Sequence, residues 1–547
     1  MKEQRVRVFN HRLYHAYLSA LFLLLAICAI SFGANTVHKV NFPFGDDDEG
    51  AVWWEAAHIT NLRVLYHPIQ QYPYIVDPYP PVYDVVTWLV EKGTGNFLIA
   101  GRLVSVFSAL GICVLVGLIV WNCSTPQSPM RFRVAGATLG ALLCLRLDTL
   151  NAYIPEMGVD LLAVFLSFLG IYVFLRYSAS SAARYMAFAI FVAAIFTKQT
   201  MVAAPSACLV ATALVSYGKA LRSFLFCLFL GGSALGLLYW ATGGEILRHL
   251  FVYNAAQPFG WSEAVRGLQA NVIIMVPILA VSCLALLPVI RRIVSNGGYG
   301  LAKWIKFGTK TNSYRLALVV LGIKLILAMS LSLSYGKNGA GVHYFLEWNF
   351  VCCPLAGLLF VRILCQTHTT SQVGLGQSAV LLLLLFAVLT GLPDSIRRIN
   401  NAFRLSPRDR AIEDSEYSTS AAALNVLKQT QGPVWCGNML LTMEAHKEPP
   451  LEPGIQEALA KAGIWDESGF VNMITTQKFG AIVLRDVDMG NLTNKQVQAI
   501  ETNYLPEENI GGSYLGHYTV YRPRPREHRY VSTTCRISPN IQRLARP

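Results

Sequence analysis

The sequence predicts a polytopic α-helical membrane domain followed by a small extracytoplasmic α/β domain. Of its 547 residues, 54% are hydrophobic and 14% are charged, whereas soluble domains carry charge on about a quarter of their residues. Apolar runs of nearly membrane-spanning length recur from residue 17 to residue 392. After Pro393 the composition becomes charged and polar, and strand-like runs alternate with helical patterns.

About eleven apolar runs are expected to cross the membrane. The first follows Arg5, Arg7 and Arg12 and resembles a signal peptide, but no small-residue cleavage site stands out, so we interpret it as a retained span. The spans are residues 17–32, 97–121, 134–150, 157–174, 185–196, 201–215, 223–240, 272–290, 316–333, 350–364 and 380–392. Residues 185–215 alternatively form one long tilted helix with a polar notch at Thr197–Thr200.

The distribution of basic residues predicts the orientation. A net charge of +13 would suggest a nucleic-acid partner in a soluble protein, but here the basic residues lie mainly in short segments between apolar runs. If the N-terminus is cytoplasmic, the inner segments carry more Lys and Arg than the outer loops. We therefore expect no nucleic-acid partner. We expect loops 33–96, 241–271 and 334–349, and everything after residue 393, to face away from the cytoplasm.

The polar C-terminal part is divided into a connector at residues 394–420 and a domain at residues 421–547. Strands are expected at Pro433–Cys436, Gly480–Leu484 and Tyr518–Tyr521, and helices at Ile455–Ala462 and Asn494–Asn503. This region contains no glycine-rich phosphate loop and no metal-ligand spacing. We interpret it as a structural domain, or as a lid that positions the acceptor, rather than a second active site.

The first outer loop, residues 33–96 within the membrane domain 1–393, contains an acidic cluster. Asp46, Asp47, Asp48 and Glu49 are consecutive. Carboxylates this close repel one another, which raises the proton affinity of at least one of them. Such a cluster is typical of a general base or of a divalent-cation site, although a solvated acidic turn has the same pattern.

Two elements after the cluster favour a built site over a loose linker. Residues Val52–Tyr66 have an amphipathic pattern with two tryptophans, which predicts a helix lying along the membrane surface. Asp77–Tyr83 contains consecutive prolines, which deny the backbone helical geometry and predict a rigid extended turn.

Short motifs along residues 1–365 resemble those of one family in order and in topological placement. They are Asp48-Glu49, Tyr79–Tyr83, Ala100–Leu103, Val159–Leu162 with Leu175-Arg176, Thr197–Thr200 and Tyr344–Glu347. The sequence resembles the GT-C membrane glycosyltransferases, in particular the branch of protein O-mannosyltransferases and lipid A aminoarabinose transferases. The resemblance implies sugar transfer from a polyprenyl-phosphate carrier outside the cytoplasm, usually with inversion, in a bacterial inner membrane.

The resemblance also implies roles for the acidic loop residues. Asp48 would be the general base that deprotonates the acceptor, and Glu49 would support it or help to hold a divalent cation. The family's second acidic position lies just before the double proline, where this sequence has Pro78. Asp77, next to it, is the substitute, and this departure puts metal binding by Glu49 and Asp77 in doubt.

A leaving lipid phosphate accumulates negative charge, which cations stabilise where water is scarce. The outward-facing cations nearest to predicted span ends are Arg102, Lys198, Lys337 and Arg248, and each is alternatively an interfacial side chain that extends toward water. Ionisable groups within spans are costly and usually functional. The predicted substrate pocket therefore includes Asp77, Tyr79, Tyr83, Asp160, Tyr344 and Glu347.

Two other classes compete with an enzyme. A transporter or flippase of lipid-linked sugar would show paired repeats with broken helices in two halves, and the sequence has no clear internal repeat. A non-catalytic scaffold of the same fold would be expected to lose the acidic loop residues, yet Asp48 and Glu49 are present. The acceptor is expected to be a lipid, a polysaccharide or a protein.

Overall fold

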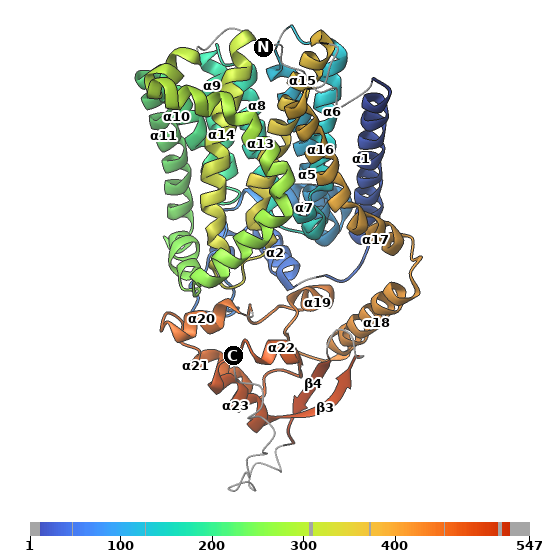
Figure 1. Cartoon of the computed structure of the whole chain (residues 1–547). Coiled ribbons are helices and arrows are strands. Elements are labelled where there is room, and N and C mark those ends of the chain that lie inside the picture. Colours follow the sequence, from blue (N-terminus) through green and yellow to red (C-terminus); the bar gives the residue numbers. More distant parts are fainter. Residues whose placement is uncertain are drawn as a thin grey trace.

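The computed structural model describes residues 11–45, 47–125, 127–305, 310–370, 374–452, 454–511 and 517–525. Asp46 of the acidic cluster and the side chain of Asp47 lie outside this description. A bundle of long helices occupies one end of the molecule, and the C-terminal residues form a smaller layer of helices and strands below it (Figure 1). The first turn of α1 (His11–Val40) lies at the far end of the bundle from that layer.

Each predicted span corresponds to a helix. Besides α1 these are α5 (Phe97–Cys123), α6 (Met130–Arg146), α8 (Val159–Arg176), α9 (Ser181–Ile195), α10 (Ala203–Val215), α11 (Tyr217–Ala241), α13 (Trp261–Trp304), α14 (Lys310–Leu331), α15 (Leu346–Thr370) and α16 (Leu375–Thr390). Among the described residues, 8 helices are long and apolar enough to cross a membrane, and α9 and α10 are shorter apolar helices. The chain is therefore an integral membrane protein. The alternative of one long helix across residues 185–215 is wrong, because α9 and α10 are separate helices with Lys198 between them.

Short helices fill the end of the bundle that faces the C-terminal layer. They are α2 (Asp47–His58), α3 (Leu62–Leu65), α4 (Val82–Thr94), α7 (Asp148–Tyr153), α12 (Glu245–Leu247), η1 (Arg248–Tyr253), η2 (Ser332–Gly336) and η3 (Val342–Phe345). The predicted surface helix over Val52–Tyr66 is wrong. Its apolar side chains belong to α2 and α3, and those of Trp53 and Trp54 are buried by protein, since α2 packs on α4, α5 and α19 (Met439–Glu444).

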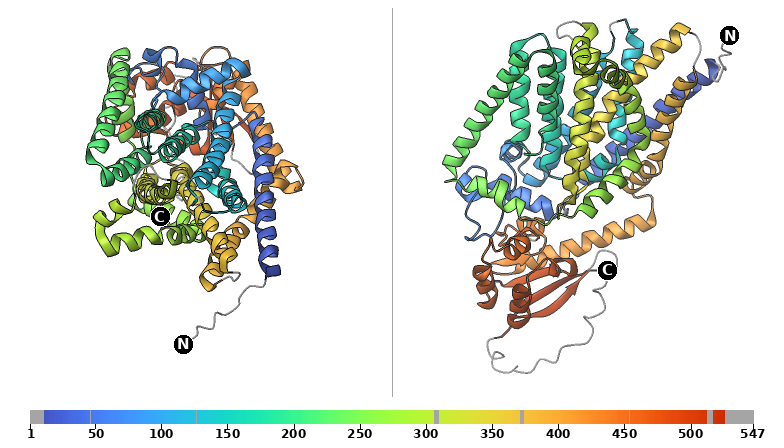
Figure 2. Two further views of the ribbon diagram at one scale, coloured as in Figure 1. Left: turned by 90° about the horizontal axis from the view of Figure 1, so that it is seen from above. Right: turned by 60° about the vertical axis from the view of Figure 1, so that its left-hand side comes forward.

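The C-terminal layer contains a four-stranded sheet in the order β1-β2-β4-β3. Its strands are β1 (Val434–Cys436), β2 (Ala481–Arg485), β3 (Tyr504–Ile510) and β4 (Tyr518–Pro523); β1 and β2 are parallel and the other pairs antiparallel. The accompanying helices are α17 (Leu392–Ala402), α18 (Pro407–Gln429), α20 (Ile455–Lys461), α21 (Ser468–Thr475), α22 (Asp486–Met489) and α23 (Asn494–Asn503). Figure 2 shows the sheet and the helices from α18 onward below the bundle from a second side, whereas α17 packs against α1.

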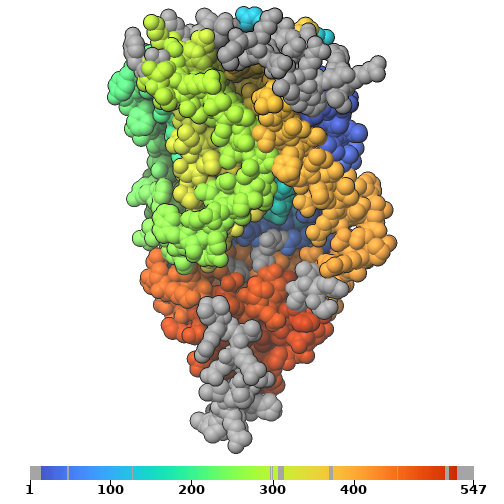
Figure 3. Space-filling view, in the orientation of Figure 1, coloured from blue at the N-terminus to red at the C-terminus, as the bar shows by residue number. Residues whose placement is uncertain are grey.

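The first outer loop is built into the C-terminal layer. The Tyr74 N–H donates to the Pro450 carbonyl at 2.9 Å, and the Gln456 amide donates to the Tyr74 carbonyl at 2.6 Å. Ile69 and Val76 belong to the same apolar core as C-terminal residues. The two parts therefore form one continuous surface (Figure 3), and backbone hydrogen bonds and apolar burial hold the C-terminal layer against the outer loops.

A buried ion pair joins three helices just inside the bundle. The Lys324 ammonium on α14 lies 3.3 Å from a Glu347 carboxylate oxygen on α15 and donates to the Ser167 hydroxyl on α8 at 2.9 Å. The side chain of Lys324 is fully buried. Each of these buried charges is therefore stabilised by the other.

Replacing Lys324 with Met should strongly destabilise the protein, because Glu347 would remain as a buried charge without its cation. Breaking such a pair costs about 3–5 kcal/mol, whereas replacing both partners by apolar residues is often nearly neutral. We expect the melting temperature of the purified protein to fall in Lys324→Met and to recover in the double variant Lys324→Met, Glu347→Leu. Equal melting temperatures for the single variant and the natural protein would contradict this interpretation.

Candidate functional site

A cavity of about 700 Å³ lies between the outer loops of the bundle and the C-terminal layer. Its walls come from α2, from the turn at residues 78–79, from residues 153–160 and 198–200, from residues 250–259 and from residues 334–344. Met439, Glu452, Gly454, Ile455 and Asn491 of the C-terminal layer complete it. Seven of the twelve predicted site residues line this cavity: Asp48, Glu49, Tyr79, Asp160, Lys198, Lys337 and Tyr344.

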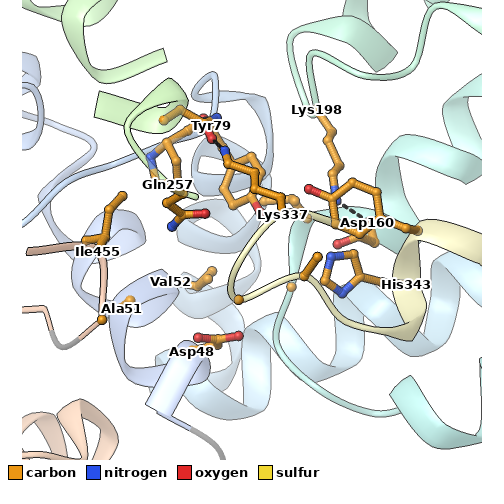
Figure 4. A pocket seen from close by; sticks show the side chains of 18 of the residues that line it. Asp48, Ala51, Val52, Tyr79, Asp160, Lys198, Gln257, Lys337, His343 and Ile455 are labelled. Atoms are coloured by element: carbon orange, nitrogen blue, oxygen red, sulfur yellow. Dashed lines mark hydrogen bonds and ion pairs between the residues drawn. The ribbon is translucent and has the colours of Figure 1, made fainter. Parts of the chain in front are cut away.

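The acidic loop divides at the first turn of α2. Asp48 is exposed and lies in the wall of the cavity, apart from the group that Lys198, Asp160 and His343 form on the other side (Figure 4). Glu49, the next residue, is buried. Consecutive residues of a helix point in directions about 100° apart, which places one carboxylate in the cavity and the next in the protein interior.

Glu49 is held by Arg102 rather than presented to a ligand. The Arg102 guanidinium donates to both Glu49 oxygens, at 2.8 Å and 2.7 Å, and the Met157 N–H adds a hydrogen bond of 2.8 Å. Arg102 also donates to the carbonyls of Lys39 and Phe42. This paired, buried guanidinium is absent from the cavity wall. Arg102 therefore anchors the loop after α1 to α5 and is not placed to bind a phosphate in the cavity.

Lys198 and Asp160 form a buried ion pair opposite Asp48. The Lys198 ammonium lies 2.6 Å from an Asp160 oxygen, and the Tyr153 hydroxyl donates to the other oxygen at 3.2 Å. The ammonium also lies over the rings of Tyr344, at 4.8 Å, and Tyr79, at 5.5 Å. These contacts fix the cation at the cavity wall, and the break between α9 and α10 carries it there.

Lys337 adds a second cation to this side of the cavity. It follows η2, and its ammonium contacts the Asn254 side-chain oxygen. Burial and the charge of Lys198 lower the pKa of Lys337 to about 8. Two neighbouring cations that repel each other in a partly dry pocket are suited to bind an anion.

Four more predicted site residues lie outside the cavity wall. Arg248 is paired with Glu245 at 3.3 Å, and its side chain is 62% exposed. Tyr83 is buried and donates to the Gly101 carbonyl at 3.1 Å. Glu347 belongs to the ion pair with Lys324, and Asp77 is fully buried behind the wall.

A second acidic group with raised carboxyl pKa values lies close to the cavity and is formed by Glu55, Asp77, Asp84 and Glu452. Burial, together with the neighbouring carboxyls, raises the pKa of Glu55 and Asp84 well above the usual range. Burial raises the pKa of Asp77 to about 7 and that of Glu452 to about 8. Three of these residues come from the first outer loop and its helices, and Glu452 comes from the C-terminal layer.

This second acidic group predicts that stability falls with rising pH. Glu452 keeps its proton to about pH 8 in the folded protein, whereas a carboxyl in an unfolded chain releases it near pH 4.3. Between these values the folded state binds more protons, so raising the pH favours unfolding. We expect a lower melting temperature at pH 8 than at pH 5, and a smaller difference in Glu452→Gln. A melting temperature that rises from pH 5 to pH 8 would contradict this.

Several cavity residues were not predicted from the sequence. Tyr153 and His343 flank the Lys198–Asp160 pair with ring centroids 5.5 Å apart, and Glu55 and Glu452 occupy the acidic side. The position of Glu55 seven residues after Asp48, on the same helical face, was a usable signal. The sequence carries no such signal for Glu452, because only the docking of the C-terminal layer brings this residue to the cavity.

The residues proposed for a divalent cation do not form a ligand set. Both oxygens of Glu49 are taken by Arg102, and Asp77 accepts a hydrogen bond from the Tyr79 N–H at 3.0 Å. Within the part of the chain that the structure describes, no three His, Cys, Asp or Glu side chains are placed to hold a metal ion. The arrangement therefore does not fit a cation between Glu49 and Asp77.

Comparison with known proteins establishes the fold. No protein-family model matches the chain, and no curated protein sequence is significantly similar to it. The structure of ArnT from Cupriavidus metallidurans bound to undecaprenyl phosphate is similar with a TM-score of 0.54 and 11% identity, over 91% of this chain and 97% of that chain. The apo structure of the same protein gives 0.51 and 12% identity, over 92% and 98%. The predicted GT-C fold, with many membrane helices and a small C-terminal sheet, is therefore confirmed.

Proposed function

We propose that this protein transfers a sugar from a polyprenyl-phosphate carrier to an acceptor on the extracytoplasmic side of the membrane. The observation that carries the proposal is the cavity at the end of the membrane helices, with the Asp48 carboxylate on one side and the ammonium groups of Lys198 and Lys337 on the other. The fold shared with ArnT, solved with undecaprenyl phosphate, supports the choice of donor.

The two lysines bind the phosphate of the donor. When the bond between the anomeric carbon and the phosphate oxygen breaks, negative charge grows on that oxygen, and fixed cations in a partly dry cavity stabilise it. Asp160 holds Lys198 in place at 2.6 Å, and the remaining two N–H groups of the ammonium stay available as donors.

Asp48 acts as the general base. It takes the proton from the acceptor group that attacks the anomeric carbon, while the phosphate leaves toward the lysines. Because base and leaving group lie on opposite sides of the cavity, attack occurs from the face opposite the phosphate, and the configuration inverts. The C-terminal layer covers this space and positions a lipid, polysaccharide or protein acceptor.

The topology completes the proposal. The start of α1 and the C-terminal layer lie at opposite ends of the bundle. With the excess of Lys and Arg on the N-terminal side, this arrangement supports a cytoplasmic N-terminus and an extracytoplasmic cavity. A bacterial inner membrane is the setting that supplies a polyprenyl-phosphate donor to such a cavity.

The function is tested with the purified full chain in vesicles that contain undecaprenyl phosphate carrying a radiolabelled sugar. We expect cleavage of the donor with release of undecaprenyl phosphate. The label should move to a water-soluble or lipid acceptor that is present in the same vesicle preparation. A panel of donor sugars covers the unknown sugar. Movement of intact labelled donor across the bilayer, without cleavage, would instead establish the transporter.

Donor binding should weaken as the pH rises through about 8. Lys337 loses its charge there because its pKa is lowered to about 8, whereas an Arg at the same position keeps its charge at every accessible pH. We expect the affinity for undecaprenyl phosphate to fall between pH 7 and pH 9 in the natural protein and to stay nearly constant in Lys337→Arg. If the affinity of Lys337→Arg for undecaprenyl phosphate fell between pH 7 and pH 9 as steeply as that of the natural protein, Lys337 would be excluded as a phosphate ligand.

A further inference from the structure

The cavity contains a buried carboxyl group that the proposed reaction does not use. Glu55 on α2 is 2% exposed, borders the cavity, and has one side-chain oxygen, Oε2, that makes no hydrogen bond with any described residue. None of the ion pairs in the described part of the chain includes Glu55. A ligand that donates a hydrogen bond to this carboxyl group would supply the missing partner.

A second carboxyl faces the same space from another part of the chain. Glu452 borders the cavity from the C-terminal layer, and its Oε2 atom accepts from the Val76 N–H at 3.2 Å. Burial, the carboxyls of Asp77 and Asp84, and then those of Glu452 and Asp48 raise the pKa of Glu55. These groups therefore lie close enough to disfavour one another's ionised forms, and a positive charge between them would favour ionisation of each.

Basic and acidic side chains line different sides of the cavity. Lys198 and Lys337 occupy the side where the donor phosphate is proposed to bind (Figure 4). Glu55 on α2 and Glu452 of the C-terminal layer also line the cavity. A positive group is repelled from the lysines and favours the ionised form of the two carboxyls, which release their protons as they bind it, whereas a phosphate is distributed in the opposite way. Donor and acceptor would thus be sorted by charge before the reaction.

We propose that the acceptor carries a positively charged nitrogen group, an ammonium, that binds to Glu55 and Glu452. The inference rests on the proposed function, because it takes the cavity as the place where donor and acceptor meet. Seven residues separate Asp48 from Glu55 on one helix, which corresponds to about 10 Å. The ammonium therefore lies about 10 Å, or two helical turns, from the acceptor atom that attacks the sugar.

The test measures equilibrium binding of 8-amino-1-octanol to the purified full chain in lipid nanodiscs. This probe has a hydroxyl and an ammonium at the ends of a chain long enough to join Asp48 and Glu55. Its neutral counterpart is 1,8-octanediol. Since hydrogen bonds to charged groups contribute about 1.5–3 kcal/mol, we expect the amino alcohol to bind at least about tenfold more tightly than the diol. The shorter 3-amino-1-propanol should lose most of this advantage.

Matched variants identify the group responsible. Glu55→Gln keeps the shape of the side chain but cannot ionise when an ammonium binds, and should remove the preference for the amino alcohol. Glu263→Gln, at an exposed carboxylate on α13 paired with Arg266, should retain the preference. Equal binding of amino alcohol and diol by the natural protein, or a preference that persists in Glu55→Gln, would overturn the inference.

Binding of undecaprenyl phosphate to the same preparations separates this inference from the proposed function. Lipid-phosphate binding without an ammonium preference overturns the cationic acceptor and leaves sugar transfer intact. An ammonium preference without lipid-phosphate binding overturns sugar transfer, and with it the identification of the bound cation as an acceptor.

Discussion

Replacing Asp48 with Asn should reduce sugar transfer by about 10²–10⁴-fold, which is the usual contribution of a general base. Asn has nearly the same shape as Asp but cannot take a proton at neutral pH. Asp48 lies at the exposed first turn of α2, so the substitution disturbs little packing. The measurement is the initial rate of label transfer from undecaprenyl-phosphate sugar at saturating donor.

Donor affinity supplies the control for Asp48→Asn. The lysines that bind the phosphate lie across the cavity from Asp48, so the affinity for undecaprenyl phosphate should stay within about threefold of the natural value, a change below 1 kcal/mol. Asp48→Glu keeps a base at a changed position and should retain a fraction of the rate. A correctly folded Asp48→Asn protein with full transfer activity would exclude Asp48 as the base.

The membrane helices were predictable from the sequence because lipid allows few alternatives. A spanning segment must satisfy its own backbone hydrogen bonds and remain apolar, so runs such as residues 97–121 show directly where helices such as α5 lie. The prediction of a membrane-surface helix over Val52–Tyr66 was wrong for a related reason. Amphipathic spacing marks an apolar face but does not say whether lipid or protein covers it, and Trp54 is covered by protein.

In the C-terminal layer, buried strands were predictable and the edge strand was not. β2 is a continuous apolar run with a buried centre. β3 contains Pro506, Glu507 and Glu508 and lies at the edge of the sheet, where charged residues and proline prevent further pairing. Such a strand has almost no hydrophobic pattern. How the predicted strands and helices divide into a separate domain at residue 421 stays a prediction.

The candidate site was predictable only where local chemistry marked it. Asp160 was predicted because a charge within a membrane span is costly and usually functional, and Lys198 because it is an outward-facing cation near the ends of predicted spans. The Glu49–Arg102 pair joins residues 53 positions apart. Glu452 reaches the cavity only through the docking of residues 67–77 on the C-terminal layer. Contacts of this kind depend on the tertiary structure and leave no mark in the spacing of the sequence.

Replacing Lys198 with Met should lower sugar transfer by about 10²–10³-fold, the usual effect of removing one preorganised group that stabilises developing charge. The ammonium is held by Asp160 at 2.6 Å and lies over the rings of Tyr344 and Tyr79, so it is preorganised at the cavity wall. The measurement is the transfer rate together with the affinity for undecaprenyl phosphate, and both should fall.

Loss of the ion pair must be separated from loss of the cation. Lys198→Met leaves Asp160 as a buried charge without its cation, which alone is expected to destabilise the protein by several kcal/mol. In the double variant Lys198→Met, Asp160→Asn, the uncompensated charge is removed, so the melting temperature should recover while transfer stays low. If transfer recovered together with stability, Lys198 would be a structural partner of Asp160, and the phosphate would have to be bound by Lys337 alone.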